Sequence, residues 1–384
     1  MEIYFDNSAT TRVLDSVRDV VVKVMTEDYG NPSAKHRKGM EAEQYLRRTA
    51  ADIAKTMKVK DKEILFTSGG TESNNMALIG TAMANQRAGK HIISTRIEHA
   101  SVYNPLAFLE QQGFEVTWLS VDSKGHISLK ELEESIRPDT ILVSIMYVNN
   151  EIGAIEPVEE IASIVHGKNP AILLHVDAIQ AYGKLVIHPK KQGIDLLSVS
   201  AHKLHGPKGV GFLYIDERVK IRPLLYGGGQ QKDLRSGTEN VPGIAGMGVA
   251  VREMFTDHQQ KVDYITGLKD YMIDRMEQLE GVTVNSLKGS EGAPQIVSVS
   301  FAGVRSEVLL HALEDKGIYV SSGSACSSNH PAISGTLKAV GVRKELLDST
   351  LRFSLGMFNK KEEIDECIRA LEELLPVLRK YYRS

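Results

Sequence analysis

The stretch SAHKLHGPKG, residues 200–209, follows a mostly apolar run at 194–199 and decides how the rest of the chain is interpreted. A β-rich apolar segment that ends in small and polar residues places its last side chains at the carboxyl end of a strand, where open α/β sheets bind ligands. Lys203 is expected at that edge. Because Ser200 and His202 can hydrogen-bond an anion, Lys203 is suited to form a Schiff base beside a phosphate. Taken alone, the segment is equally compatible with a solvated lysine beside a Gly-Pro turn.

Length and composition set outer limits on the interpretation. The chain has 384 residues, so we expect one large and one smaller domain. Its 46 Lys and Arg residues against 49 Asp and Glu residues give a net charge of −3, which provides no electrostatic case for a nucleic-acid partner. The two cysteines, Cys326 and Cys367, make no disulfide framework. The N-terminus is not leader-like and there is no run of 18 apolar residues, so we expect a cytoplasmic protein without membrane contact. No metal site is predicted.

Strands that alternate with helices predict a parallel sheet whose carboxyl edge collects polar residues. Strands are expected at residues 63–67, 91–95, 114–119, 140–147, 172–176, 194–199 and 210–215, and helices at 14–27, 39–57, 71–79, 102–112, 129–136 and 158–165. Gly70 and Thr71 follow the first strand and offer backbone N–H groups to a phosphate. His99 follows the second, where an imidazole can stack on the ring of pyridoxal 5′-phosphate (PLP) if Lys203 holds that cofactor. Ordinary turn and surface residues are the alternative for each signal alone.

An acidic side chain follows the buried strand at 172–176. Asp177 is costly to bury there without a partner. The protonated ring nitrogen of PLP is such a partner, and Gln180 lies close enough in sequence to reach the ring hydroxyl. A helix N-cap role for Asp177 is compatible with this assignment. Asn149 falls at the carboxyl end of the strand at 140–147.

From about residue 258 the alternation stops, and a second, smaller domain is predicted. It contains a long amphipathic helix, strands at 295–301 and 318–320, and helices at 306–316 and 361–378. Cys326 lies among small residues in a predicted loop at 321–329, where a thiol is accessible for reaction, whereas Cys367 lies in a helical pattern and is predicted to be structural. Arg352 lies in a predicted edge strand at 351–355 and can bind a carboxylate bidentately. Residues 4–11 are predicted to be a loop that reaches the site, with a frayed terminus as the alternative.

Together these segments resemble the cysteine desulfurases of aminotransferase class V, in the branch linked to iron–sulfur cluster assembly, over residues 4–375. The motifs that carry the resemblance are DNSATT at 6–11, YGNPS at 29–33, TSGGTES at 67–73, EH at 98–99, NNEIG at 149–153, HVDAIQ at 175–180, SAHKLHGPKGVG at 200–211, RSGT at 235–238, SGSAC at 322–326 and LRFSLG at 351–356. The resemblance implies an α/β PLP-dependent transferase of fold type I. Its large domain, residues 14–257, holds a mostly parallel seven-stranded sheet, and residues 1–13 with 258–384 form a smaller α/β domain.

The resemblance also implies a role for each site residue. Lys203 binds PLP covalently, His99 stacks on its ring, and Cys326 is the thiolate that takes the sulfur. The implied cofactor-binding residues are Gly70, Thr71, His99, Asn149, Asp177, Gln180, Ser200, His202 and Lys203, joined by Thr238 from the other subunit of a homodimer. Arg352 and Asn149 hold the substrate carboxylate. The implied reaction converts L-cysteine into L-alanine and leaves a persulfide on Cys326 for a sulfur acceptor, either an iron–sulfur scaffold or a tRNA thiolation enzyme.

Two segments depart from the family pattern, namely SSNHPAI at 327–333 and GMFN at 356–359. They leave the identity of the sulfur acceptor open. A class-V aminotransferase needs Lys203, Asp177 and Arg352 but has no use for Cys326. A selenocysteine lyase differs only in its substrate. Both remain alternatives to a desulfurase at this stage.

Overall fold

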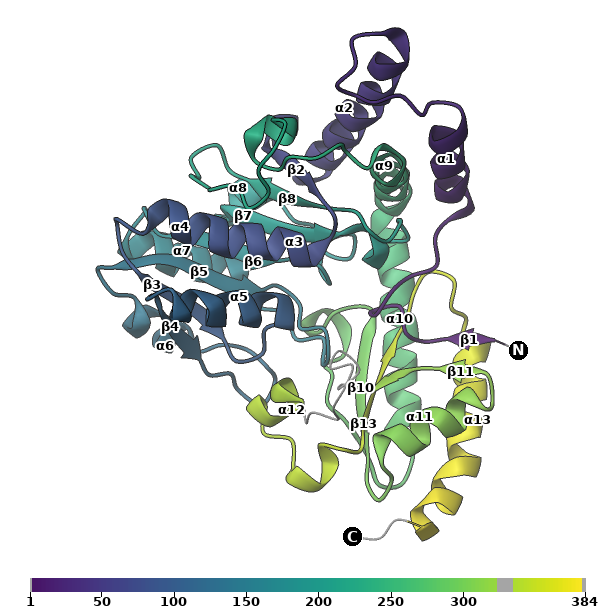
Figure 1. The fold of residues 1–384 in the computed structure, drawn as a ribbon. Coiled ribbons are helices and arrows are strands. Elements are labelled where there is room, and N and C mark those ends of the chain that lie inside the picture. Colours follow the sequence, from purple (N-terminus) through teal and green to yellow (C-terminus); the bar gives the residue numbers. More distant parts are fainter. Residues whose placement is uncertain (1, 323–333, 382–384) are drawn as a thin grey trace.

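The computed structural model describes residues 2–322 and 334–381, and it contains two principal sheets, each with its own hydrophobic core (Figure 1). The predicted loop segment that carries Cys326 lies outside the described residues. The boundary at residues 257/258 stays a prediction. In the described part of the chain, no helix is both long and apolar enough to cross a bilayer.

The larger sheet has seven strands in the order β2-β8-β7-β6-β5-β3-β4. These strands are β2 (Ile64–Thr67), β3 (His91–Thr95), β4 (Glu115–Leu119), β5 (Thr140–Met146), β6 (Leu173–Asp177), β7 (Leu196–Ser200) and β8 (Gly211–Ile215). Strand β8 runs antiparallel to its two neighbours, β2 and β7, and all other adjacent strands of this sheet pair in parallel. The predicted mostly parallel seven-stranded sheet is therefore confirmed. Strands β3 and β5 to β7 are buried along their whole length, which explains their nearly continuous apolar sequences.

Helices cover both faces of this sheet. One face is packed by α3 (Gly70–Asn75), α4 (Thr81–Asn85) and α5 (Ala100–Gln111), with a π-helical turn at Met76–Gly80 joining the first two. The other face is packed by α2 (Arg37–Met57), α7 (Val158–Lys168) and α9 (Val241–Phe255), while α1 (Asp15–Thr26) lies against α9. Short helices α6 (Leu129–Ser135) and α8 (Pro189–Gln192) complete this part.

Helix α9 was not predicted from the sequence, because its repeated glycines are typical of a loop. Their role is close packing. A β-carbon added to Gly246 would lie 2.7 Å from Pro207 and 2.8 Å from Val21, and one added to Gly248 would lie 2.4 Å from Thr49. The missing side chains therefore let α9 approach α1 and α2 closely.

The smaller sheet has the order β12-β13-β10-β9. Its strands are β9 (Val282–Val284), β10 (Ile296–Phe301), β12 (Ser321–Ser322) and β13 (Thr350–Ser354); the surrounding helices are α10 (His258–Met276), α11 (Ser306–Glu314), α12 (Gly335–Ala339) and α13 (Lys361–Leu378). The predicted edge position of the strand that carries Arg352 is wrong, since β13 pairs with β10 on one side and β12 on the other. A two-residue strand of serines provides that second neighbour, and it has no recognisable strand pattern.

The N-terminal segment is anchored to the smaller core before it reaches the larger sheet (Figure 1). Strand β1 (Ile3–Tyr4) pairs in parallel with β11 (Ile318–Tyr319). Ile3 and Phe5 are fully buried in the second core, so the frayed-terminus alternative is wrong. Residues 6–11 then run to the carboxyl edge of the seven-stranded sheet, as predicted for a loop that reaches the site.

Candidate active site

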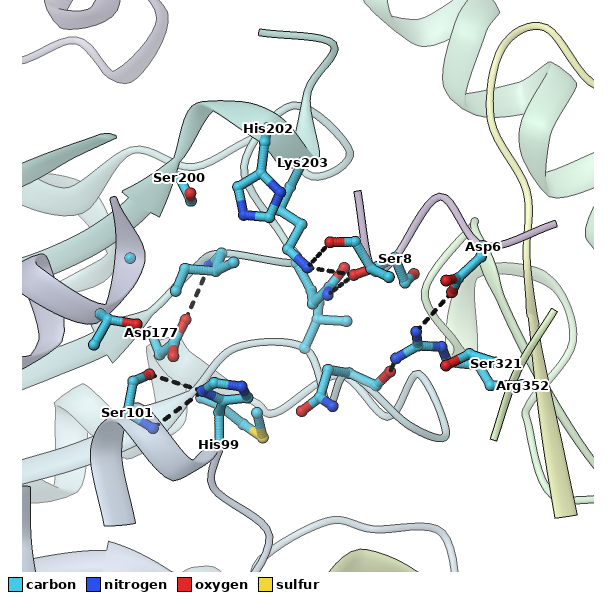
Figure 2. A pocket seen from close by; sticks show the side chains of 18 of the residues that line it. Asp6, Ser8, His99, Ser101, Asp177, Ser200, His202, Lys203, Ser321 and Arg352 are labelled. Carbon is cyan, nitrogen blue, oxygen red and sulfur yellow. Dashed lines mark hydrogen bonds and ion pairs between the residues drawn. The ribbon is translucent and has the colours of Figure 1, made fainter. Parts of the chain in front are cut away.

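A cavity of about 330 Å³ lies between the carboxyl edge of the seven-stranded sheet and strand β13. Nine of the predicted site residues line it: Gly70, Thr71, His99, Asp177, Gln180, Ser200, His202, Lys203 and Arg352. Figure 2 shows Asp177 and His99 on one side, Lys203 and His202 above, and Arg352 with Asp6 on the far side. The cavity therefore brings together side chains from both sheets.

Lys203 ends a short 3₁₀ turn, Ala201–Lys203, directly after β7. Its Nζ donates hydrogen bonds to the main-chain carbonyls of Ser8 and of Ala9, the latter at 2.8 Å (Figure 2). Gln180 Nε2 donates to the same Ser8 oxygen at 2.9 Å. The N-terminal segment therefore holds the amine of Lys203 against the cavity.

Asp177 ends β6 and is 4% exposed. One of its carboxylate oxygens accepts the N–H of Ile179 at 3.0 Å, and the other accepts Nδ2 of Asn74 at 2.8 Å. Burial raises the pKa of Asp177, while these hydrogen bonds and the positive charge of Lys203 oppose the rise. A buried carboxyl held in this way is ready to bind a cationic N–H group from the cavity side.

His99 is the N-cap of α5. Its Nδ1 accepts the backbone N–H of Ser101 at 3.1 Å, so the neutral imidazole carries its proton on Nε2. Asn74 Nδ2 also donates to Ser101 Oγ at 2.9 Å, which links the supports of His99 and Asp177. The ring is thereby fixed in orientation as well as in tautomer.

The opposite end of the cavity is suited to an anion. Gly70, Thr71, Ser200 and His202 line both this cavity and an adjoining one that Lys208 also lines. A β-carbon at position 70 would lie 2.2 Å from Ile179, so this turn admits only glycine without a shift. Burial, and next the charge of Lys203, lower the pKa of His202 to about 4, which makes the ring a neutral hydrogen-bonding group near pH 7.

Arg352 projects from the middle of β13 and is 7% exposed. Its guanidinium donates to Asp6 Oδ1 at 2.9 Å and to the main-chain oxygen of Asn150 at 2.8 Å (Figure 2). Nη1 and Nη2 each carry a second N–H group beyond these contacts. The guanidinium is thus held in place with donor capacity left for a carboxylate.

Two predicted residues are not brought to the cavity wall, and the position of a third is not described. Asn149 is buried beside it, where its side chain bonds the main chain of Ile97, Glu151 and Ile152. Thr238 is exposed and does not line the cavity. The predicted position of Cys326 lies outside the described residues. The roles of these residues stay predictions.

Sequence reasoning missed the residues that support the site. Asn74 stands in the first turns of a helix, and an asparagine there is a weak signal because it is a poor helix former. Asp6 was noticed only as part of a polar loop; its ion pair with Arg352 joins positions 346 residues apart. No local pattern reveals a contact of that kind.

Comparisons with known proteins agree on one family. A family model described as aminotransferase class-V matches residues 3–367. The chain is 45% identical over 380 residues to the mitochondrial cysteine desulfurase of Saccharomyces cerevisiae, which covers 98% of this chain and 76% of that protein. It is 42% identical over 379 residues to cysteine desulfurase IscS of Dictyoglomus turgidum, covering 98% and 95%.

Solved structures are similar along the whole fold. A structure titled NifS-like protein superposes with a TM-score of 0.93 at 39% identity, covering 98% of this chain and all of that one. A NifS-like protein from Rickettsia africae superposes with a TM-score of 0.87 at 29% identity, with the same two coverages. Each of these likenesses spans both sheets and the cavity between them.

Proposed function

Because this chain belongs to the aminotransferase class-V family, in which it is a cysteine desulfurase, we propose that Lys203 holds PLP in the described cavity and that Cys326 receives sulfur from L-cysteine there. The family implies dependence on PLP and a fold-type-I architecture. The observation that carries the proposal is the convergence of Lys203, Asp177 and Arg352 on one cavity.

The residues present fit the cofactor. Asp177 offers a buried carboxyl to a protonated ring nitrogen, and His99 presents a ring whose orientation is fixed by Ser101. Gly70, Thr71, Ser200 and His202 surround the end where a phosphate would bind, beside the cationic Lys208. PLP, when bound, supplies an electron sink for charge that develops at the substrate α-carbon.

The chain's own groups then carry the remaining steps. Arg352 binds and orients the carboxylate of L-cysteine, and Lys203 Nζ removes the proton from its α-carbon. The thiolate of Cys326 attacks the substrate sulfur and forms an S–S bond. As the substrate C–S bond breaks, its electron pair stays on carbon, which is protonated and leaves as L-alanine.

The position of Cys326 in the sequence supports its part in this proposal. Ser322 lines the cavity and lies four residues before Cys326. Four residues of chain span at most about 14 Å between Cα atoms, so the sequence separation allows the thiol of Cys326 to reach the cavity. Burial raises the pKa of the other cysteine, Cys367, to about 12, which leaves it unreactive.

We also propose the homodimer, with Thr238 completing the phosphate end of the partner's site. Thr238 is exposed and does not line the cavity of its own subunit, so its side chain is available to a second subunit, which supports this assignment. Three residues in succession before it, Gln231, Lys232 and Asp233, hold positive φ values of 47°, 61° and 62°, and such strain is typical of functional contact loops. The sulfur acceptor and the cytoplasmic location remain predictions.

The deciding experiment measures L-alanine and sulfide formed from L-cysteine by wild type, Cys326→Ala and Cys367→Ala. Cys326→Ala should abolish alanine formation while keeping the cofactor spectrum and its change on adding L-cysteine. Cys367→Ala is the matched control and should keep its turnover within about twofold, although the lost packing costs about 1 kcal/mol of stability. Wild-type turnover by Cys326→Ala would refute the persulfide step, and transamination instead of alanine release would favour an aminotransferase.

A further inference from the structure

A buried lysine lies directly behind the partly exposed Lys203. Lys184 is 9% exposed and belongs to the connection between β6 and α8. Its Nζ donates a hydrogen bond to the main-chain carbonyl of Lys203. This contact is not anticipated by the sequence, where Lys184 follows a glycine in an ordinary turn.

The hydrogen bond satisfies a main-chain carbonyl that has no partner within the 3₁₀ turn. The turn is closed by the N–H of Leu204, which bonds to the carbonyl of Ala201. The carbonyl of Lys203, at the end of the turn, therefore needs a donor from elsewhere. Lys184 provides it. Because Nζ of Lys203 is held separately by the carbonyls of Ser8 and Ala9, the residue is positioned at both its main chain and its side-chain end.

Lys203 is the charged group that acts on Lys184. The neighbouring His202 and His205 have pKa values lowered to about 4 and are neutral near pH 7, and in the described part of the chain Lys184 forms no ion pair with a carboxylate. Burial, and next the charge of Lys203, lower the pKa of Lys184 to about 7. By the same coupling, a proton on Lys184 disfavours a proton on Lys203.

We propose that Lys184 is a positioning residue for Lys203, which fixes the main chain behind the reactive amine and, in its protonated form, disfavours a proton on Lys203, so that Lys203 releases its proton more readily. The inference rests on the proposed function, in which the Lys203 nitrogen holds PLP and serves as the base. A lysine beside another cationic group is a known means of activating an amine.

The test is a pH titration of the visible absorption of the PLP-loaded enzyme, which follows the proton on the Lys203 nitrogen. Lys184→Gln keeps a side-chain N–H donor but removes the charge, so the titration midpoint should rise by about one pH unit. In Lys184→Arg the charge is retained, and the midpoint should equal that of wild type or fall below it. Lys191→Met, which removes an exposed lysine from the following helix α8, should leave the midpoint unchanged.

The outcomes separate this inference from the function on which it rests. If borohydride does not fix the absorbing group to Lys203 in the wild-type enzyme, both are overturned. If it does, an unchanged midpoint in folded Lys184→Gln overturns the inference alone. Should Lys184→Gln not fold, a midpoint above that of wild type in Lys184→Arg contradicts the proposal, because a permanent charge at this position cannot favour protonation of Lys203.

Discussion

The seven-stranded sheet presents Lys203 and Asp177 from the ends of β7 and β6, two neighbouring parallel strands, whereas the four-stranded sheet presents Arg352 from the middle of an antiparallel strand. Asp177 accepts hydrogen bonds from Ile179, two residues further along the chain, and from Asn74 in α3. Arg352 instead pairs with Asp6, which lies near the other end of the sequence. The comparison indicates that the reactive groups of the first side come from consecutive βα units, although Ser8, Ala9 and Asn74 also hold them from distant segments. On the second side, both partners that hold Arg352, Asp6 and Asn150, are distant in sequence.

The largest effect is expected on the first side. Lys203→Ala should lower kcat/KM for L-cysteine by at least about 10³-fold, because both the covalent anchor and the base are lost. Borohydride should then fix no cofactor to the chain, as measured by mass spectrometry of the tryptic peptide. Covalent fixation at unchanged stoichiometry would show that another amine holds PLP.

An intermediate effect is expected on the second side. Arg352→Gln removes a charge-assisted, bidentate contact and should lower kcat/KM by about 10²-fold, chiefly through a higher KM, while PLP content stays unchanged. Arg352→Lys, which keeps the charge but not the two-pronged geometry, should recover only part of the loss. If Arg352→Gln lost PLP instead, the two sides of the cavity would not divide cofactor and substrate as proposed.

The smallest effect concerns the support of Asp177. Asn74→Ala removes the donor to one carboxylate oxygen, so the pKa of Asp177 should rise further and its hold on the cofactor should weaken. We expect roughly tenfold faster loss of PLP on dialysis, followed by absorbance. Asn75→Ala is the matched control, since that side chain bonds to the main chain of its own helix at Thr71. Equal losses in both variants would assign the effect to the helix rather than to Asp177.

The same contrast explains what the sequence predicts and what it does not. Lys203, Asp177 and His99 follow apolar strands, so their shared edge is predictable from the order of the elements. Arg352 was identified as a carboxylate-binding residue, but its interior strand position was missed because the neighbouring strand β12 is two serines long. Helix α9 was missed because glycines that serve close packing are, in sequence, indistinguishable from glycines of a loop.

Supporting contacts were the least predictable part of the site. Lys184, Asn74 and Asp6 act through other residues, and each meets its partner only after the elements are packed. Their residue types are common on protein surfaces, so composition does not mark them. Such contacts follow from three-dimensional proximity alone.

The pairing of Asp6 with Arg352 also bears on how the chain is made on the ribosome. Strands β2 to β8 span residues 64–215, so the larger sheet can assemble while the rest of the chain is still being synthesised. Asp6, however, has to wait for a residue 346 positions later. At about 5–20 residues per second, that interval lasts roughly 20 to 70 s, during which the apolar Ile3 and Phe5 have no native core to enter. Residues 3–6 are thus among the last to fold although they are made before the larger sheet, and a nascent-chain chaperone would find them exposed during most of that interval.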